Sequence, residues 1–188
     1  MGSRPVTTLS LRPRVAREQA LDRLGALGRW PVVGPGPLRR VADVYVPFHL
    51  YKVGVRSGAS AGTSWLALDA VSGALDPYEF DRPPDEAELV RIQTRNRPEP
   101  ALSDAEAAQL VRDKVRRVVF QTGFFRLRGA LQLDLERQPL ELHMPYWLGF
   151  YGAEERLRLR VLDAVRGRVE GNKARALFEA WLRDARAA

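Results

Sequence analysis

The stretch Val44–Gly73, VYVPFHLYKVGVRSGASAGTSWLALDAVSG, decides the fold because a second version of it follows nearly a hundred residues later. The pattern predicts two β-strands that end in a tight turn. In the second version, Leu142–Gly167, the segment MPYWL stands where VPFHL stands in the first. The closing segment LDAVRG then repeats LDAVSG. We therefore expect an internal duplication of one structural unit.

The composition predicts a globular protein. The chain has 188 residues, of which 45% are hydrophobic, enough to bury the core of one domain or of two small ones. The absence of cysteine excludes disulfides and thiolate metal sites. No segment approaches the roughly 20 apolar residues of a membrane helix, and residues 1–13 lack the apolar core of a signal peptide. We expect a cytoplasmic protein without a transmembrane segment.

The periodicity of apolar residues predicts an α+β protein. We expect two repeated units of a helix plus antiparallel strands, with an additional C-terminal helix. The first unit is expected in residues 1–82, a linker with a short helix in 83–100, and the second unit with the C-terminal helix in 101–188. The predicted helices span 14–27, 84–95, 104–120 and 172–185, and the predicted strands span 40–56, 65–71, 74–80, 131–135, 140–151 and 156–165. Residues 6–12 are expected to form either a short strand or a disordered lead-in. Ser103 and Glu106 have the spacing of a capping box at the start of the third helix.

A helix, a long strand and a strand that closes on LDAVSG together resemble the PepSY domain, whose signature is a valine-rich strand pair ending in an Asp-Ala-x-Thr-Gly turn. The resemblance covers residues 15–78 and, more loosely, 105–169. Ser72 and Arg166 stand where the signature has threonine. The resemblance implies an α+β fold. PepSY domains are non-catalytic modules, often secreted or membrane-linked, that are thought to inhibit peptidases.

Equivalent aspartates precede the two turns. Asp69 with Gly73, and Asp163 with Gly167, suit a structural role, because an aspartate before a glycine-containing turn accepts hydrogen bonds from backbone N–H groups two or three residues on. A pair of related carboxylates also suits acid–base catalysis or metal binding. We favour the structural role.

The two histidines lie in the duplicated strand at positions that are not equivalent. His49 aligns with Trp147, and His143 aligns with Tyr45. No HxH, HxxxH or HxxE spacing supports a metal site, and no nucleotide-binding or hydrolase motif is present. We expect structural histidines, with a pH-sensitive or catalytic role as the alternative, and neither a metal nor a cofactor.

Aromatic residues gather in the duplicated strands and are candidates for a partner-binding surface. The reason is that strands with apolar residues on both faces need cover on both, and any face that the helices leave open is available to a partner. The candidate residues are Phe48, Tyr51, Tyr146, Trp147 and Phe150.

The net charge is +7 and the basic excess is greatest near the N-terminus. Only three of the thirty basic residues are lysine, which indicates a GC-rich coding sequence rather than selection for nucleic-acid contacts. Two groups form a candidate basic patch: Arg12, Arg14 and Arg17, and Arg156, Arg158 and Arg160. The second group alternates along a strand and could contact phosphates, or form cross-strand ion pairs with Asp134 and Glu136. We favour the ion pairs.

These observations favour a non-enzymatic protein-interaction or assembly module that binds another protein or itself. The first alternative is a basic protein associated with nucleic acid through its arginine-rich faces. A third hypothesis is an enzyme whose site contains the two histidines and the two turn aspartates.

Overall fold

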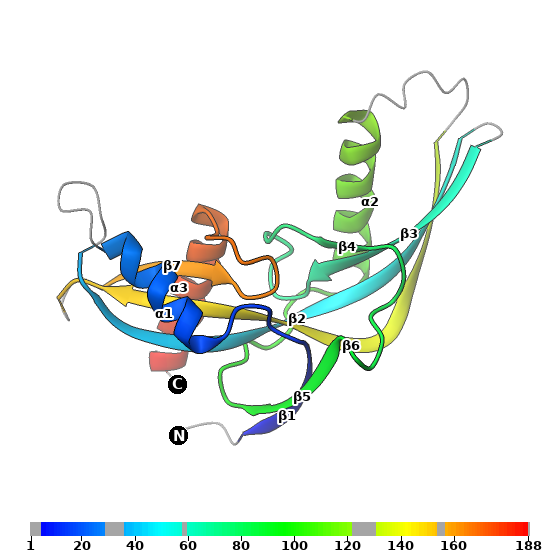
Figure 1. Ribbon diagram of the computed structural model, residues 1–188. Helices are drawn as coiled ribbons and strands as arrows, with labels where there is room; N and C mark the ends of the chain where they lie inside the picture. Colours follow the sequence, from blue (N-terminus) through cyan, green and yellow to red (C-terminus); the bar gives the residue numbers. More distant parts are fainter. Residues whose placement is uncertain (1–4, 29–35, 58–59, 122–130, 154–156, 188) are drawn as a thin grey trace. The chain divides into compact units, whose positions relative to one another are not determined.

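The computed structural model describes residues 5–28, 36–57, 60–121, 131–153 and 157–187 (Figure 1). Within them the α+β class is confirmed. The helices are α1 (Arg17–Gly28), α2 (Asp104–Gln121) and α3 (Asn172–Ala187). The strands are β1 (Val6–Leu11), β2 (Leu38–Ser57), β3 (Ser60–Asp69), β4 (Tyr78–Phe80), β5 (Leu89–Thr94), β6 (Gln132–Tyr151) and β7 (Arg158–Asp163). The strand order is β4-β3-β2-β6-β1-β5, and β7 pairs with β6.

The chain divides into two compact units that do not follow its sequence halves. Unit 1 contains Met1–Val46, Glu86–Pro98 and His143–Ala188. Unit 2 contains Pro47–Asp85 and Glu99–Leu142. The strands β2 and β6, each 20 residues long, contribute one part to each unit.

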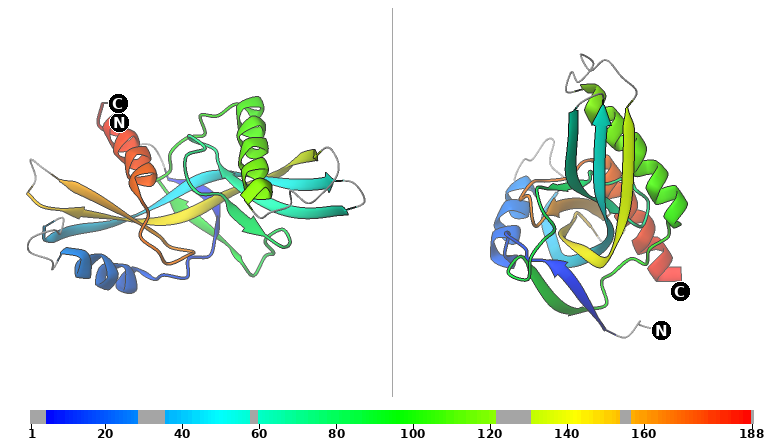
Figure 2. Two further views of the ribbon diagram at one scale, coloured as in Figure 1. Left: turned by 90° about the horizontal axis from the view of Figure 1, so that it is seen from above. Right: turned by 90° about the vertical axis from the view of Figure 1, so that its right-hand side faces the viewer.

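In unit 1, α1 and α3 lie on opposite faces of the sheet formed by β6 and β7 (Figure 2). On the α1 side, Ala20 and Leu24 pack against Val41, Tyr151 and Leu162. On the other side, the ring of Phe178 in α3 lies 5.6 Å from that of Tyr146. Unit 1 therefore has helical cover on both faces of these strands.

In unit 2, β2 and β3 form a hairpin paired from Phe48 with Asp69 to Ser57 with Ser60. Helix α2 covers one face of this hairpin (Figure 1). Alternate residues of β2 and β3 face the helix, as the period of two in a strand requires. The cluster they form contains Tyr51, Val53, Leu66, Leu68, Ala107, Val111 and Val115.

Two predicted elements differ in the structure. The helix expected at residues 84–95 was wrong, because β5 occupies Leu89–Thr94 and pairs antiparallel with β1. The distribution of charges in this segment favours a helix only weakly. The hydrogen bonds that the segment forms with the edge of β1 stabilise a strand more than those charges stabilise a helix. The strands expected at 131–135 and 140–151 form the single strand β6, which tolerates Pro139 because an edge strand needs no donor on its open side.

Candidate partner-binding site

Four of the five aromatic candidates lie in the core. Phe48, Tyr51, Tyr146 and Phe150 expose between 1% and 6% of their surface. The ring of Phe48 meets Tyr78 edge-on at 5.6 Å. In the folded chain each of these four side chains is buried in the core of its own unit. They are therefore not available as a partner-binding surface.

Trp147, the fifth candidate, is half-buried beneath the segment that leads into α1. Its indole Nε1–H donates a hydrogen bond to the carbonyl of Val15 at 2.9 Å. An indole that finds a partner for its N–H while its ring packs on a core is typical of a structural anchor. Trp147 therefore holds the start of α1 on the sheet of unit 1.

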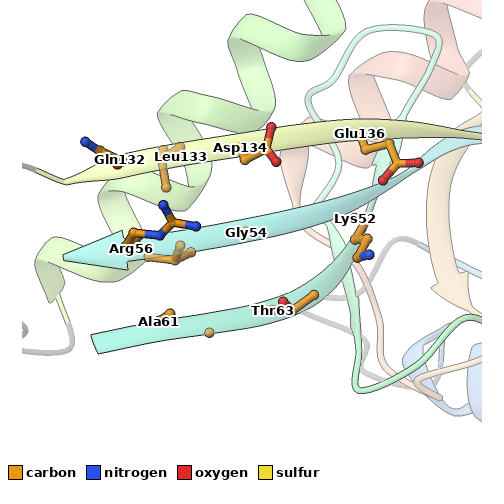
Figure 3. A pocket seen from close by; sticks show the side chains of 11 residues that line it. Lys52, Gly54, Arg56, Ala61, Thr63, Gln132, Leu133, Asp134 and Glu136 are labelled. Atoms are coloured by element: carbon orange, nitrogen blue, oxygen red, sulfur yellow. The ribbon is translucent and has the colours of Figure 1, made fainter. Parts of the chain in front are cut away.

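Among the described residues of unit 2, no helix covers the second face of its sheet. Lys52, Gly54 and Arg56 alternate with the residues that face α2 and so point away from it. Strand β4 pairs only with Trp65–Ala67, so the far part of β3 has no strand on its outer side among the described residues. A hollow of about 700 Å³ lies over this open face (Figure 3). Its lining consists of Lys52, Gly54, Val55, Arg56, Ala61, Gly62, Thr63, Gln132, Leu133, Asp134 and Glu136.

The open face carries charges of both signs. Lys52, Arg56, Asp134 and Glu136 line the hollow, and none of them forms an ion pair within the described part of the chain. Gly54 lies beside Asp134, since a Cβ built on Gly54 would stand 3.4 Å from the aspartate Cβ. Gly54 has no side chain that could neutralise the negative charge of Asp134. The carboxylate of Asp134 is therefore available to a positive group from outside.

The outer edge of β6, Gln132–Leu142, is the margin of this face. Strand β7 pairs with Tyr146–Tyr151 and β1 meets β6 at His143, so no described strand pairs with the outer edge. Leu133 and Leu135 point to the α2 side and are only partly buried. An unpaired edge of this kind is a template for another strand.

A second polar group ties α2 to the strands. The Arg137 guanidinium pairs with Asp104 at the start of α2 and bonds His49 Nδ1 at 3.0 Å. Because arginine only donates, His49 Nδ1 accepts, and the neutral ring carries its proton on Nε2. Burial lowers the pKa of His49, as does Arg137, while the nearby carboxylates of Asp104, Glu141 and Asp69 oppose the shift. This geometry gives His49 a structural position beside a hollow of about 530 Å³.

His143 lies in unit 1, where it is 1% exposed and its Nδ1 lies 3.2 Å from the carbonyl oxygen of Leu9. His49 and Asp69 belong to unit 2, whereas His143 and Asp163 belong to unit 1. In the described ranges, no three His, Asp or Glu residues are arranged to hold a metal ion.

Both turn aspartates are fully buried and accept backbone hydrogen bonds. Asp69 Oδ1 accepts from the amides of Val71 and Ser72 at 2.8 and 3.2 Å. Asp163 Oδ1 accepts from Val165 and Arg166 at 2.8 Å each. Gly73 and Gly167 close the turns with φ of +65° and +70°. These are the residues and bonds that a structural turn requires.

The basic residues are dispersed. Arg12 donates to the carbonyls of Ala87 and Leu89, so it fastens the chain around β5. Arg14 and Arg17 are exposed. Arg156 lies outside the described residues.

Arg158 is exposed and Arg160 half-buried on β7. The favoured ion pairs of these arginines with Asp134 and Glu136 are absent, because β7 pairs with Tyr146–Tyr151 of β6 and not with its first residues. All four side chains thus lack an ion pair in the part of the chain that is described.

Comparison of the chain with protein-family models, with curated proteins and with solved structures found no match. No helix among the described residues combines the length and the apolar character needed to cross a membrane.

Sequence reasoning missed the open face as a candidate site. Its signal was present in the polar alternation of Lys52 and Arg56 around Gly54, and of Asp134 and Glu136 in the neighbouring strand. Aromatic content drew attention to the inner parts of the same strands instead.

Proposed function

We propose that the chain is a non-enzymatic protein-interaction module, built from a duplicated α+β unit, that binds its partner at the open face and the outer edge of β6. The observation that carries this proposal is the sheet of unit 2, which has a helix on one face and, among the described strands, an unpaired outer edge on β6. Backbone groups at a free edge give affinity, and alternating side chains give specificity.

The lining favours a polypeptide over a small apolar ligand. Pockets for small molecules are concave and mostly apolar, whereas this hollow combines two cations, two carboxylates and the half-buried Leu133. A second polypeptide offers groups of both signs together with apolar side chains. Protein interfaces likewise combine an apolar centre with a polar rim.

Matching hydrogen bonds support the duplication. The amide of Ala70 donates to the carbonyl of Pro47 at 2.9 Å, and that of Ala164 donates to Pro145 at 3.1 Å. The strand registers also correspond, since Phe48 lies opposite Asp69 and Tyr146 opposite Asp163.

The segments before the helices extend this correspondence. The carbonyl of Ala70 accepts from Ala101 and Leu102 just before α2, at 2.9 and 3.0 Å. The carbonyl of Ala164 accepts from Arg14 and Val15 just before α1, at 2.8 and 2.9 Å. A duplicated unit of helix, long strand and DAVxG-closing strand accounts for both sets of bonds, and a PepSY-like origin of that unit is part of the proposal.

Nucleic acid is the second candidate partner, because Arg14, Arg17 and Arg158 are exposed on a chain of net charge +7. On the open face the carboxylates of Asp134 and Glu136 offset the cations of Lys52 and Arg56, so phosphates would find no net positive charge there. Binding of nucleic acid would therefore use the arginines and leave the outer edge of β6 free.

The proposal is tested by photo-crosslinking in the cell of origin. A photoreactive amino acid replaces the exposed Thr63 on the open face, with a control at the exposed Gln93 of β5. We expect nuclease-resistant crosslinks to protein from position 63 and few from position 93. Crosslinks to nucleic acid alone, or equal crosslinking from both positions, would contradict the proposal.

A further inference from the structure

The outer edge of β7 has an alternating pattern. Arg158 and Arg160 point to one face of the sheet, and Leu159 and Val161 point to the other. On its inner side β7 pairs with β6. On its outer side the described chain reaches it only beyond Arg160, where the Glu170 amide donates to Val161 at 2.8 Å and residues 162 and 169 form a bridge. As far as the described residues go, the outer backbone edge of Arg158–Arg160 is open to another strand.

Apolar side chains are exposed at this edge. Leu157 is 37% exposed and Val169 is 43% exposed, and they lie at the two ends of the open segment. A hollow of about 300 Å³ beside it is lined partly by Arg160, Val169 and Arg175. Exposed apolar groups rimmed by charge mark interaction surfaces.

The outer edge of β6 has the complementary pattern. Asp134 and Glu136 alternate with Leu133 and Leu135, so one face of the edge is acidic and the other apolar. The acidic face is opposite in charge to the arginines of β7. The apolar face corresponds to the side of β7 that carries Leu157, which is exposed, whereas Leu159 and Val161 on that side are buried.

We propose that the chain associates with a second copy of itself, with the β7 edge of one copy lying along the outer edge of β6 of the other. Arg158 and Arg160 then face Asp134 and Glu136, and Leu133 and Leu135 meet the apolar side of the added strand. This inference rests on the proposed function and names its partner.

Pairing of identical edges from two copies is unfavourable because it brings like charges together. Two β6 edges paired antiparallel would bring carboxylates together, and two β7 edges would bring guanidinium groups together, which is destabilising for directly opposed charges. Pairing β6 with β7 relieves both conflicts. Such a contact is heterologous, so it closes into a ring or continues along a chain of copies.

A charge-swap experiment tests the pairing. One variant carries Asp134→Arg and Glu136→Arg, and the other carries Arg158→Glu and Arg160→Glu. Sedimentation velocity of the full chain follows association between about 1 µM and 1 mM. We expect wild-type chains to associate, each variant alone to associate roughly tenfold more weakly, and an equimolar mixture of the two to recover association, since the swapped edges again attract.

Matched controls carry the same charge changes elsewhere. Arg14→Glu with Arg17→Glu, and Glu18→Arg with Asp22→Arg, alter exposed residues outside both edges and should leave association unchanged. Circular dichroism establishes that each variant is folded. A wild-type chain that stays monomeric over this range, or a mixture no better associated than its components, overturns the proposal. Protein crosslinks from Thr63 would in that case still support the interaction function, whereas their absence would end both.

Discussion

Asp69 and Asp163 share a set of backbone hydrogen bonds in their two turns although 94 positions separate them. In each turn the carboxylate accepts from the amides two and three residues on, and the amide of the closing glycine donates to the aspartate carbonyl, at 3.1 Å for Gly73 and 2.9 Å for Gly167. A buried carboxylate so bound is committed to the backbone and is poorly placed for proton transfer.

Replacing either aspartate should therefore destabilise the fold. We expect Asp69→Ala and Asp163→Ala each to lower the free energy of unfolding by about 1–3 kcal/mol, because both leave part-buried backbone amides without their acceptor. Urea denaturation measures the effect, and Asp22→Ala on the exposed face of α1 is the matched control. Unchanged unfolding together with lost activity would instead mark these residues as an active site.

Glycine is required at the end of the first turn for two reasons. Gly73 has φ of +65°, and a Cβ there would stand 2.5 Å from Leu110 Cδ1. We expect Gly73→Ala to cost at least about 1–2 kcal/mol from the left-handed conformation alone. Gly62→Ala is the control, because its Cβ would meet nothing within 4 Å. Equal melting temperatures for the two variants would argue against this account of the turn.

Helix α1 is anchored by Tyr151, whose buried hydroxyl donates to the carbonyl of Leu24 at 2.7 Å. Tyr151→Phe keeps the ring and removes this bond, so we expect a loss of about 1 kcal/mol. Hydrogen exchange should show the loss as faster exchange in α1 and not in α2. Uniformly faster exchange in both helices would mean that the bond supports the whole chain rather than this helix.

Acid should weaken the group formed by His49, Arg137 and Asp104. The folded chain lowers the pKa of His49 below its ordinary 6.5, so on acidification the unfolded chain takes up the proton first. The contribution of His49 to the free energy of unfolding is therefore fully present above pH 6.5. It is lost as the pH falls from 6.5 through the pKa of His49 in the folded chain. We expect the decline between about pH 7 and 5 to be smaller in His49→Gln, measured by urea denaturation at each pH. Parallel declines in the two proteins would assign the pH dependence to other groups.

Local patterns predicted most elements correctly. The capping box is confirmed, since Ser103 and Glu106 exchange side-chain and backbone bonds at the start of α2. Amphipathic spacing predicted α3 within two residues of its end. These signals depend on neighbouring residues alone.

Long-range relationships were not predictable in this way. Strand β5 exists because β1 pairs with it, across more than 70 residues of chain. Phe48 is buried because Tyr78 lies against it, and Tyr78 comes from a short strand with little signal of its own. Such contacts decide which aromatic side chains remain exposed. The candidate surface is therefore not the aromatic cluster predicted from the sequence but the polar face that carries Lys52, Arg56, Asp134 and Glu136.

The most direct test of the account is a salt titration of the purified, nuclease-treated chain, followed by its association with itself and with a labelled DNA duplex. We predict that chain–chain association persists at about 0.5 M salt, because backbone pairing and apolar burial are not screened and only the exposed ion pairs weaken. A monomeric chain that binds the duplex tightly at low salt, and loses that affinity by a factor of about 10³ or more as salt rises, would contradict it.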